Sequence, residues 1–210
     1  MKVFAINGSP KSNGNTAFAM KTALREIEDA GIVTEFVTIG RELISGCLGC
    51  GECVKRQNCR CIIEDKVNEY LPAMIEADGI LLGSPVYYSG LNGVIKSFLD
   101  RSFFVAAANG NLLRNKVGAA IAAVRRSGGI NAFDQLNKYF QISEMLTVSS
   151  NYWNVIYGMT PNEAEKDSEG VQIMQVLGKN FAWLLKSLDY AKQKFPPPPT
   201  ITKIKTNFIR

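Results

Sequence analysis

The sequence of 210 residues contains no histidine. A Ser–His–Asp triad, a histidine general base and a histidine metal ligand are therefore excluded. Long apolar runs are also absent: the longest, residues 117–124, has eight residues, whereas a membrane span needs about 20. The apolar stretch at residues 3–6 is too short for the core of a signal peptide. We therefore expect a cytoplasmic protein that does not enter a membrane.

Acidic residues are missing from the C-terminal segment 194–210, which carries four basic residues. This segment accounts for most of the net charge of +5 and leaves +1 for residues 1–193. Such a body lacks the basic surface that nucleic acid requires, so we expect no nucleic-acid partner. The 46% apolar content is typical of a globular chain. We expect one domain over residues 1–193, followed by a proline-rich tail over residues 194–210.

Cysteine is absent outside the segment 47–61, so the pattern is unlike a disulfide framework, which staples distant segments. The first three cysteines follow the spacing C-x2-C-x2-C, which favours a [4Fe-4S] cluster over zinc. Because histidine is absent, Cys59 or Cys61 must supply the fourth ligand of a metal centre. A reduced loop that holds no metal is the alternative. The five cysteines are Cys47, Cys50, Cys53, Cys59 and Cys61.

Three basic side chains accompany these cysteines, against one acid, Glu52. A cluster held by thiolates carries negative charge. We expect Lys55, Arg56 and Arg60 to offset it.

A short apolar strand at residues 2–6 leads through a glycine-rich polar loop into a helix that begins near residue 16. Free N–H groups and the helix dipole favour an anion at such a helix N-terminus. The loop is not a Walker motif, because Asn15 stands where the lysine belongs, and it is not GxGxxG. A single terminal phosphate is therefore the expected ligand. A solvated loop that caps the helix without a ligand is the alternative.

Further strands are expected at residues 33–39, 79–83, 116–124 and 147–150, alternating with helices at 65–76, 92–105, 129–144 and 169–192. This alternation predicts a parallel sheet covered on both faces. The loops 8–16, 84–90 and 124–129 follow strands, so they gather at one edge of the sheet. Together they suit a flat heteroaromatic ligand with a phosphate tail. Ordinary connections are the alternative for the second and third loops.

The chain resembles the flavodoxin-like NAD(P)H-dependent FMN reductase superfamily, and more closely its iron–sulfur flavoprotein branch. The resemblance covers about residues 1–192. It implies an α/β, flavodoxin-like, doubly wound five-stranded parallel sheet of order 2-1-3-4-5, with a cysteine-rich loop after strand 2 and a C-terminal extension. The motifs that carry it are GSPKSNGNT at 8–16, the cysteines at 47–53, GSPVYY at 83–88, Lys96 with Asp100 and Arg101, and VRRSGG at 124–129.

The resemblance also implies the cofactor sites. FMN would place its phosphate on Ser9, Lys11, Ser12, Asn13, Gly14, Asn15 and Thr16. Its isoalloxazine ring would lie between Pro85, Val86, Tyr87 and Tyr88 on one side and Val124, Arg125, Arg126, Ser127, Gly128 and Gly129 on the other. A [4Fe-4S] cluster would take Cys47, Cys50, Cys53 and Cys61, with Cys59 as the alternative fourth ligand.

The implied function is that of an FMN-dependent oxidoreductase. It would transfer electrons from NAD(P)H or ferredoxin to a small acceptor such as a quinone or flavin, and it would form a homodimer or homotetramer. The flavin does the chemistry, so no catalytic side chain is expected. Arg125, Arg126 or the N–H groups of Gly128 and Gly129 would stabilise the reduced flavin.

Two other functions are compatible with the sequence. One is a non-enzymatic electron carrier of the flavodoxin type, which the nearly neutral body disfavours because such carriers are typically acidic. The other is a zinc-bearing binding module. The tail is either free or packed on a neighbouring subunit through its apolar residues, which are Ile201, Ile204, Phe208 and Ile209.

Overall fold

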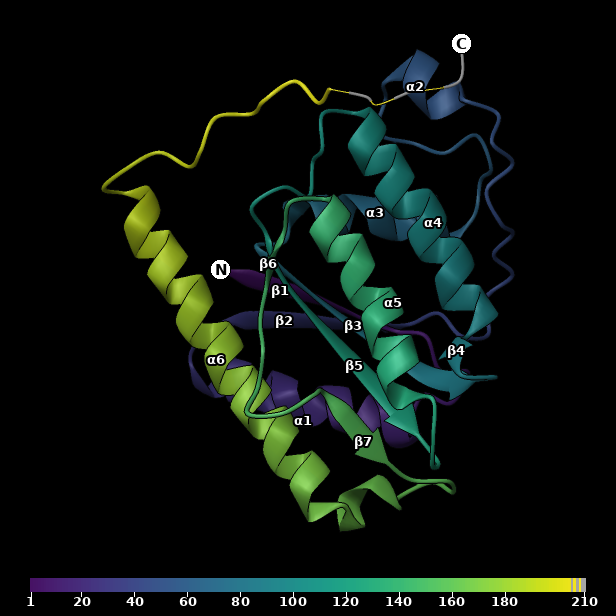
Figure 1. Cartoon of the computed structure of the whole chain (residues 1–210), viewed down its shortest axis with the longest axis vertical. Helices are drawn as coiled ribbons and strands as arrows, with labels where there is room; N and C mark the ends of the chain where they lie inside the picture. Colours follow the sequence, from purple (N-terminus) through teal and green to yellow (C-terminus); the bar gives the residue numbers. More distant parts are fainter. Residues whose placement is uncertain (205, 207, 209–210) are drawn as a thin grey trace.

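A parallel sheet lies at the centre of the computed structural model, which describes every residue except 205, 207, 209 and 210. The order of its strands is β2-β1-β3-β5-β6 (Figure 1), so the order predicted from the sequence is confirmed. These strands are β1 (Lys2–Asn7), β2 (Val33–Thr38), β3 (Gly79–Tyr87), β5 (Val117–Val124) and β6 (Leu146–Thr147).

Helices cover both faces of the sheet (Figure 1). Alternate side chains of β1 point to opposite faces of the sheet. Val3 packs on the face of α1 and α6, and Phe4 packs on the face of α3, α4 and α5. Every residue of β5 is buried, as expected for a central parallel strand. The first face carries α1 (Asn15–Asp29) and α6 (Ser168–Lys192), and the second carries α3 (Lys66–Glu76), α4 (Gly93–Ala108) and α5 (Gly129–Ile142). Two short helices complete the chain, α2 (Glu52–Arg56) and η1 (Ala164–Lys166).

The fifth strand is split, which corrects the prediction of one strand at residues 147–150. Both β6 and β7 (Val155–Tyr157) pair with β5, and the residues between them leave the sheet. Between β6 and β7, Asn154 makes the hydrogen bonds to β5. Its buried side chain donates from Nδ2 to the carbonyl of Ala120 at 3.0 Å, and its own carbonyl accepts from the Ala122 N–H at 3.0 Å. The carbonyl of Ala120 and the N–H of Ala122, at the edge of β5, therefore have hydrogen-bond partners although the neighbouring strand is interrupted.

Strand β3 extends further than predicted, because residues 84–87 continue it where the sequence favoured a loop. Pro85 pairs with Ala123 of β5. The chain then turns back into β4 (Gly90–Leu91), which is antiparallel to β3. The two turn residues, Tyr88 and Ser89, have φ values of 49° and 59°. Glycine and asparagine usually occupy such a turn, so this hairpin is strained at the edge of the predicted site.

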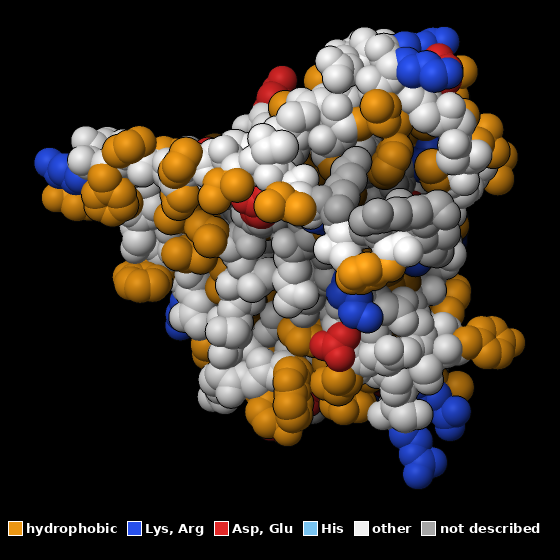
Figure 2. Space-filling model, turned by 45° about the horizontal axis from the view of Figure 1, so that its top comes forward, with side chains coloured by type: hydrophobic (Ala, Val, Ile, Leu, Met, Phe, Trp, Pro, Cys, Tyr) orange, Lys and Arg blue, Asp and Glu red, His pale blue; other side chains and the backbone are white. Residues whose placement is uncertain are grey.

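The tail leaves the end of α6 and runs across the molecule (Figure 1). Residues 196–204 form no helix or strand, and Arg114 donates from Nη2 to the Pro199 carbonyl at 3.2 Å. Phe195, Ile201 and Ile204 are exposed, and Figure 2 shows hydrophobic side chains along this arm of the molecule. Of the four apolar tail residues named as a possible contact with a neighbouring subunit, Ile209 lies outside the described residues.

No helix in the described part of the chain combines the length and the apolar character that crossing a membrane demands.

Candidate functional site

Hydrogen bonds within the glycine-rich loop, and from it to β1 and β3, hold the loop over the end of β1. The Gly8 N–H donates to the Gly83 carbonyl at 2.8 Å. The buried Asn7 accepts from the Ser9 N–H at 3.0 Å, and Ser9 Oγ accepts from the Lys11 N–H at 3.2 Å. The loop is therefore preformed at the carboxyl edge of the sheet, where ligands of open α/β sheets bind.

The N-terminus of α1 opens toward this loop without a side-chain cap. Its N-cap residue is Gly14, and no side chain accepts from the first N–H groups of the helix. These groups and the helix dipole make the position suitable for an anion. The Asn15 side chain is already engaged: Nδ2 donates to the Thr160 carbonyl at 3.0 Å, and Oδ1 accepts from the Ala164 N–H at 3.3 Å. Asn15 thus ties the loop after β7 to the glycine-rich loop.

A pocket of about 190 Å³ lies between these two loops and the ends of β3 and β5. It combines polar groups at the α1 end with apolar groups from β3. Of the predicted flavin-binding residues, it brings together Ser9, Lys11, Gly14, Asn15, Thr16, Pro85, Val86, Tyr87 and Arg125. The residues that the sequence reasoning missed are Pro10, Ala123, Gly158, Met159 and Pro161.

The remaining predicted residues lie elsewhere. Ser12 and Asn13 are exposed at the tip of the loop, and Tyr88 is fully exposed at the hairpin turn. Val124 is buried in the core. The last four predicted residues line a neighbouring hollow at the N-terminus of α5. They are Arg126, Ser127, Gly128 and Gly129.

Close backbone packing joins this second hollow to the β3–β4 hairpin. Gly128 has φ +86°, and a Cβ there would lie 2.7 Å from the Cα of Ser89. The Asn131 side chain donates to the Ser89 carbonyl. Only glycine meets both demands at position 128, so the α5 N-terminus and the hairpin turn are held together.

One carboxylate shapes the loop after β7. Glu163 accepts from the Met159 N–H at 2.6 Å and from the Thr160 N–H at 3.0 Å. Hydrogen bonds from the backbone and side chain of Thr160, and then from the backbone of Met159, lower the pKa of Glu163 to about 2. The carboxylate therefore remains charged at neutral pH and fixes the loop that carries Met159 into the pocket.

Four of the five cysteines line one small hollow. Cys47, Cys50, Cys53 and Cys61 surround it, and α4 contributes its floor. Burial raises the pKa of Cys53. The fifth cysteine, Cys59, lies outside this hollow, with φ +58° and its N–H donating to Asn109 Oδ1 at 3.0 Å. Within the part of the chain that the structure describes, no three histidine, cysteine, aspartate or glutamate side chains could hold a metal ion.

Arg101 of α4 is the charged residue of this hollow, and its side chain is 1% exposed. Nε donates to Cys61 Sγ at 3.4 Å, and Nη2 donates to Asp65 at 3.0 Å. Two backbone carbonyls, of Ser45 and Ile63, accept its other N–H groups. Burial acts to lower the pKa of Arg101, but the hydrogen bonds that Arg101 donates to Asp65 and Cys61 outweigh it and raise the pKa.

The sequence reasoning assigned the positive charge near the cysteines to other residues. In the structure those cations pair with surface carboxylates: Lys55 and Arg56 with Glu52, and Arg60 with Glu64. The signal for Arg101 was an arginine among the apolar residues Phe98, Leu99, Phe103 and Phe104 of α4.

The two sites lie at opposite ends of α4. The N–H of Asn92, its N-cap residue, donates to Ser84 Oγ at 3.2 Å, next to Pro85 of the first pocket. Phe104 and Val105, near the other end, line the cysteine hollow. Residues 92–104 of a helix span about 18 Å.

Comparison with known proteins agrees with this geometry. The profile of the family described as NADPH-dependent FMN reductase matches residues 1–160. The chain belongs to this FMN reductase family. Within the family it falls in the iron–sulfur flavoprotein branch. It is 38% identical over 193 residues to an iron–sulfur flavoprotein of Methanocaldococcus jannaschii, covering 89% of this chain and 98% of that protein.

Other proteins also match this FMN reductase family member over most of its length. It is 31% identical over 196 residues to the iron–sulfur flavoprotein of Methanosarcina thermophila, covering 92% of this chain and all of that protein. Among solved structures, RosB with bound 8-demethyl-8-formylriboflavin-5'-phosphate matches with a TM-score of 0.70 at 16% identity, over 99% of this chain and 92% of that one. An archaeal flavodoxin matches with a TM-score of 0.59 at 17% identity, over 89% and 99%. These two likenesses confirm the flavodoxin-like fold.

Proposed function

We propose that this protein is an FMN-dependent oxidoreductase that passes electrons from a reduced donor, NAD(P)H or ferredoxin, to a small acceptor such as a quinone or flavin. One observation carries the proposal. An uncapped helix N-terminus, an apolar strand end and an arginine meet in one pocket at the carboxyl edge of the sheet. That combination suits a flat ring with a phosphate tail.

Each part of the pocket has a role in holding FMN. The N–H groups at the start of α1, with Ser9 and Thr16, would bind the phosphate. Pro85 and Tyr87 would position the ring, and Arg125 would favour its reduced, anionic state. When bound, FMN supplies the capacity to accept a hydride or single electrons and to release them to an acceptor.

The cysteine hollow suits a [4Fe-4S] cluster held by Cys47, Cys50, Cys53 and Cys61. Thiolates are the ligands that iron–sulfur clusters require, and the named relatives are iron–sulfur flavoproteins. A cubane cluster spaces its thiolates more widely than a single ion does, so four thiols around one hollow are compatible with it. The position of Cys61 beside Arg101 supports Cys61 over Cys59 as the fourth ligand.

We also propose a homodimer or homotetramer. Tyr87, Tyr88, Ile130 and Met159 expose apolar surface around the flavin pocket. Exposed apolar side chains that gather in one region mark interaction sites on soluble proteins. Light scattering of the purified chain tests the assembly, and a monomer at micromolar concentration would contradict it.

An absorption spectrum of anaerobically purified protein tests both cofactors. We expect flavin bands and a broad shoulder that dithionite bleaches. Cys61→Ser should abolish the shoulder and the bound iron and leave the flavin, whereas Cys59→Ser, the matched control, should keep both. Equal iron in the two variants would contradict the ligand set. NAD(P)H oxidation with a quinone acceptor separates the enzyme from an electron carrier.

A further inference from the structure

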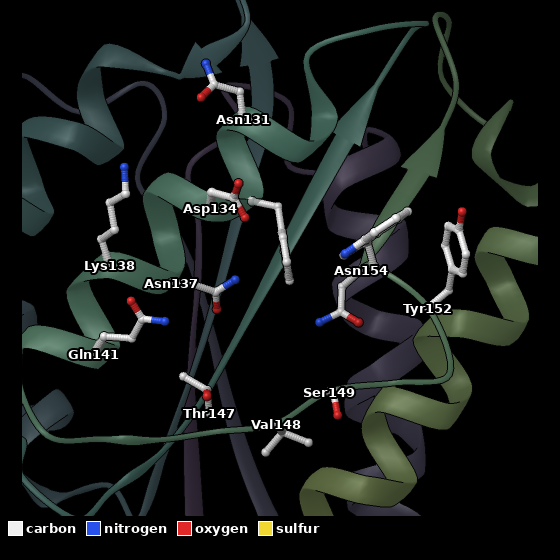
Figure 3. A pocket seen from close by; sticks show the side chains of 12 residues that line it. Asn131, Asp134, Asn137, Lys138, Gln141, Thr147, Val148, Ser149, Tyr152 and Asn154 are labelled. Carbon is white, nitrogen blue, oxygen red and sulfur yellow. The ribbon is translucent and has the colours of Figure 1, made fainter.

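Two exposed aromatic side chains stand on the segment that interrupts the fifth strand. Tyr152 and Trp153 are 58% and 52% exposed, and their rings meet edge-on with centroids 4.6 Å apart. Figure 3 shows Tyr152 across a hollow from Asp134 and Asn137 of α5. Both aromatic side chains also line a second hollow, of about 290 Å³, which α6 closes on the other side. The proposed electron transfer uses neither of them.

This second hollow, the aromatic groove, is formed by Tyr152, Trp153, β7 and the first turns of α6, and it suits a proline-rich peptide. Tyr157 of β7 joins the other two aromatic residues in its lining. Aromatic grooves bind polyproline II segments, because such a segment is already ordered before it binds. The charged residues of the groove, Asp167 and Glu169, are both acidic, so the groove also favours a basic peptide.

The tail of the chain has this chemistry. Residues 196–199 are four consecutive prolines, whose restricted φ favours the polyproline II conformation. The tail carries four basic residues and no acid. Residues 196–204 form no helix or strand, and Phe195, Ile201 and Ile204 are 64%, 83% and 92% exposed. The tail therefore has apolar surface left to bury.

The prolines cannot reach the aromatic groove of their own chain. The groove meets α6 at Gly170 and Ile173, whereas the tail follows the other end of this helix, at Lys192. Residues 173–192 of a helix span about 28 Å. Even fully extended, residues 192–199 span at most about 25 Å. All four prolines fall short, so only the groove of another copy is open to them.

We propose that the proline segment 196–199 of each chain binds in the aromatic groove of a second copy. Pro196 and Pro199 lie one polyproline II turn apart and pack on the rings of Tyr152 and Trp153. The basic residues of the tail then lie near Glu169. This inference goes beyond the proposed function, because it assigns two surfaces to one contact of the assembly and does not involve the flavin.

Site-specific photocrosslinking of the full chain tests this exchange. The photoreactive residue p-benzoylphenylalanine replaces Thr200, an exposed residue next to the prolines, where it does not disturb the fold. Isotope-labelled and unlabelled chains are mixed, irradiated and digested, and mass spectrometry identifies the linked peptides. We expect the tail of one label to be joined to residues 152–173 of the other.

Two tryptophan variants provide a matched pair. Trp153→Ser removes one ring from the groove and should lower the yield of this crosslink about tenfold or more. Trp183→Ser, at a 71% exposed position of α6 outside the groove, should leave the yield unchanged. Replacement of the four prolines by glycine, which does not favour the polyproline II conformation, should lower the yield as well.

Three results would overturn the inference. Crosslinks within one chain, to residues around Arg114, would show that the tail stays where Arg114 donates to the Pro199 carbonyl. Crosslinks to a different surface of the second copy, or no crosslinks at all, would exclude the aromatic groove as the site of the tail. Because these readouts do not use FMN, failure of FMN to bind would count only against the proposed function. An oligomer in light scattering without this crosslink would likewise leave the proposed assembly intact.

Discussion

At the scale of single residues, Arg101 is one of the largest fully buried side chains, and it is charged. Its guanidinium is buried, and Asp65 is its only carboxylate partner in the described structure. A buried charge left without its partner costs about 3–5 kcal/mol. Asp65 is also the N-cap of α3, where it accepts from the Val67 N–H at 3.0 Å. Loss of the arginine therefore affects both α3 and the cysteine hollow.

We predict that Arg101→Met lowers the free energy of unfolding by about 3–5 kcal/mol, measured by urea denaturation. Lys179→Met is the control, because Lys179 pairs with Glu26 on the surface at 3.8 Å, and such pairs contribute about 0–1 kcal/mol. A similar small loss in both variants would show that the Arg101–Asp65 pair does not stabilise the fold.

Gly40 supports the glycine-rich loop from behind. A Cβ at this position would lie 2.2 Å from the carbonyl carbon of Ser9 and 2.4 Å from the Gly8 oxygen. Both are backbone atoms, so the loop must move. We predict that Gly40→Ala weakens FMN binding by at least tenfold in a fluorescence titration. Gly93→Ala, where a Cβ meets nothing within 4 Å, should bind FMN normally. Equal affinity in the two variants would contradict the role of the loop.

At the scale of elements, the loop after β7 depends on the charge of Glu163. Its pKa in the folded state, about 2, lies below the ordinary value of 4.5. The stabilisation is therefore complete above about pH 4.5 and is lost as the pH falls toward 2.

We predict that Glu163→Gln lowers the melting temperature at pH 7 and at pH 5 by the same amount. The difference from the wild type should shrink between pH 4.5 and pH 2. Glu165→Gln, on the neighbouring η1 helix, is the control for loss of one negative charge. A difference that vanishes already at pH 6 would rule out this carboxylate as the cause.

Asn154 makes hydrogen bonds to β5 where its neighbouring strand is interrupted. We predict that Asn154→Ala destabilises the fold by about 1–3 kcal/mol, because the buried carbonyl of Ala120 loses its donor. Asn151→Ala, at an exposed position of the same segment, should change stability by less than about 0.5 kcal/mol. Thermal unfolding of both variants measures the difference, and equal stability would contradict the bridging role.

The same interruption explains what the sequence did not reveal. Three of the four preceding strands are predictable as runs of mostly apolar residues, and β2, with the sequence VTEFVT, as a segment rich in β-branched residues. The fifth is divided by residues 149–154, four of which are serine or asparagine, and the strand at 155–157 has only three residues. The sequence predicts the last strand at 147–150. It therefore does not predict that Gly158, Met159 and Pro161 follow a strand, β7, into the pocket. Side-chain contacts such as that of Arg101 with Cys61 depend on tertiary packing, which periodicity does not describe.

At the scale of the whole molecule, α4 separates the two proposed cofactors. The flavin pocket adjoins its N-terminal end, and the cysteine hollow adjoins its C-terminal half. At the carboxyl edge of the sheet, the flavin pocket lies beside the hollow that contains Arg126 at the N-terminus of α5. The arrangement places small-molecule chemistry at one end of the molecule and the thiols at the other.

Titration of the apoprotein with FMN and with riboflavin is the most direct test of the central claim, that a phosphate-bearing flavin binds at the N-terminus of α1. The account predicts one FMN per chain and an affinity for riboflavin lower by at least a hundredfold, since riboflavin lacks the phosphate that the helix N-terminus binds. Equal affinities for the two flavins, or no binding of FMN, would contradict it.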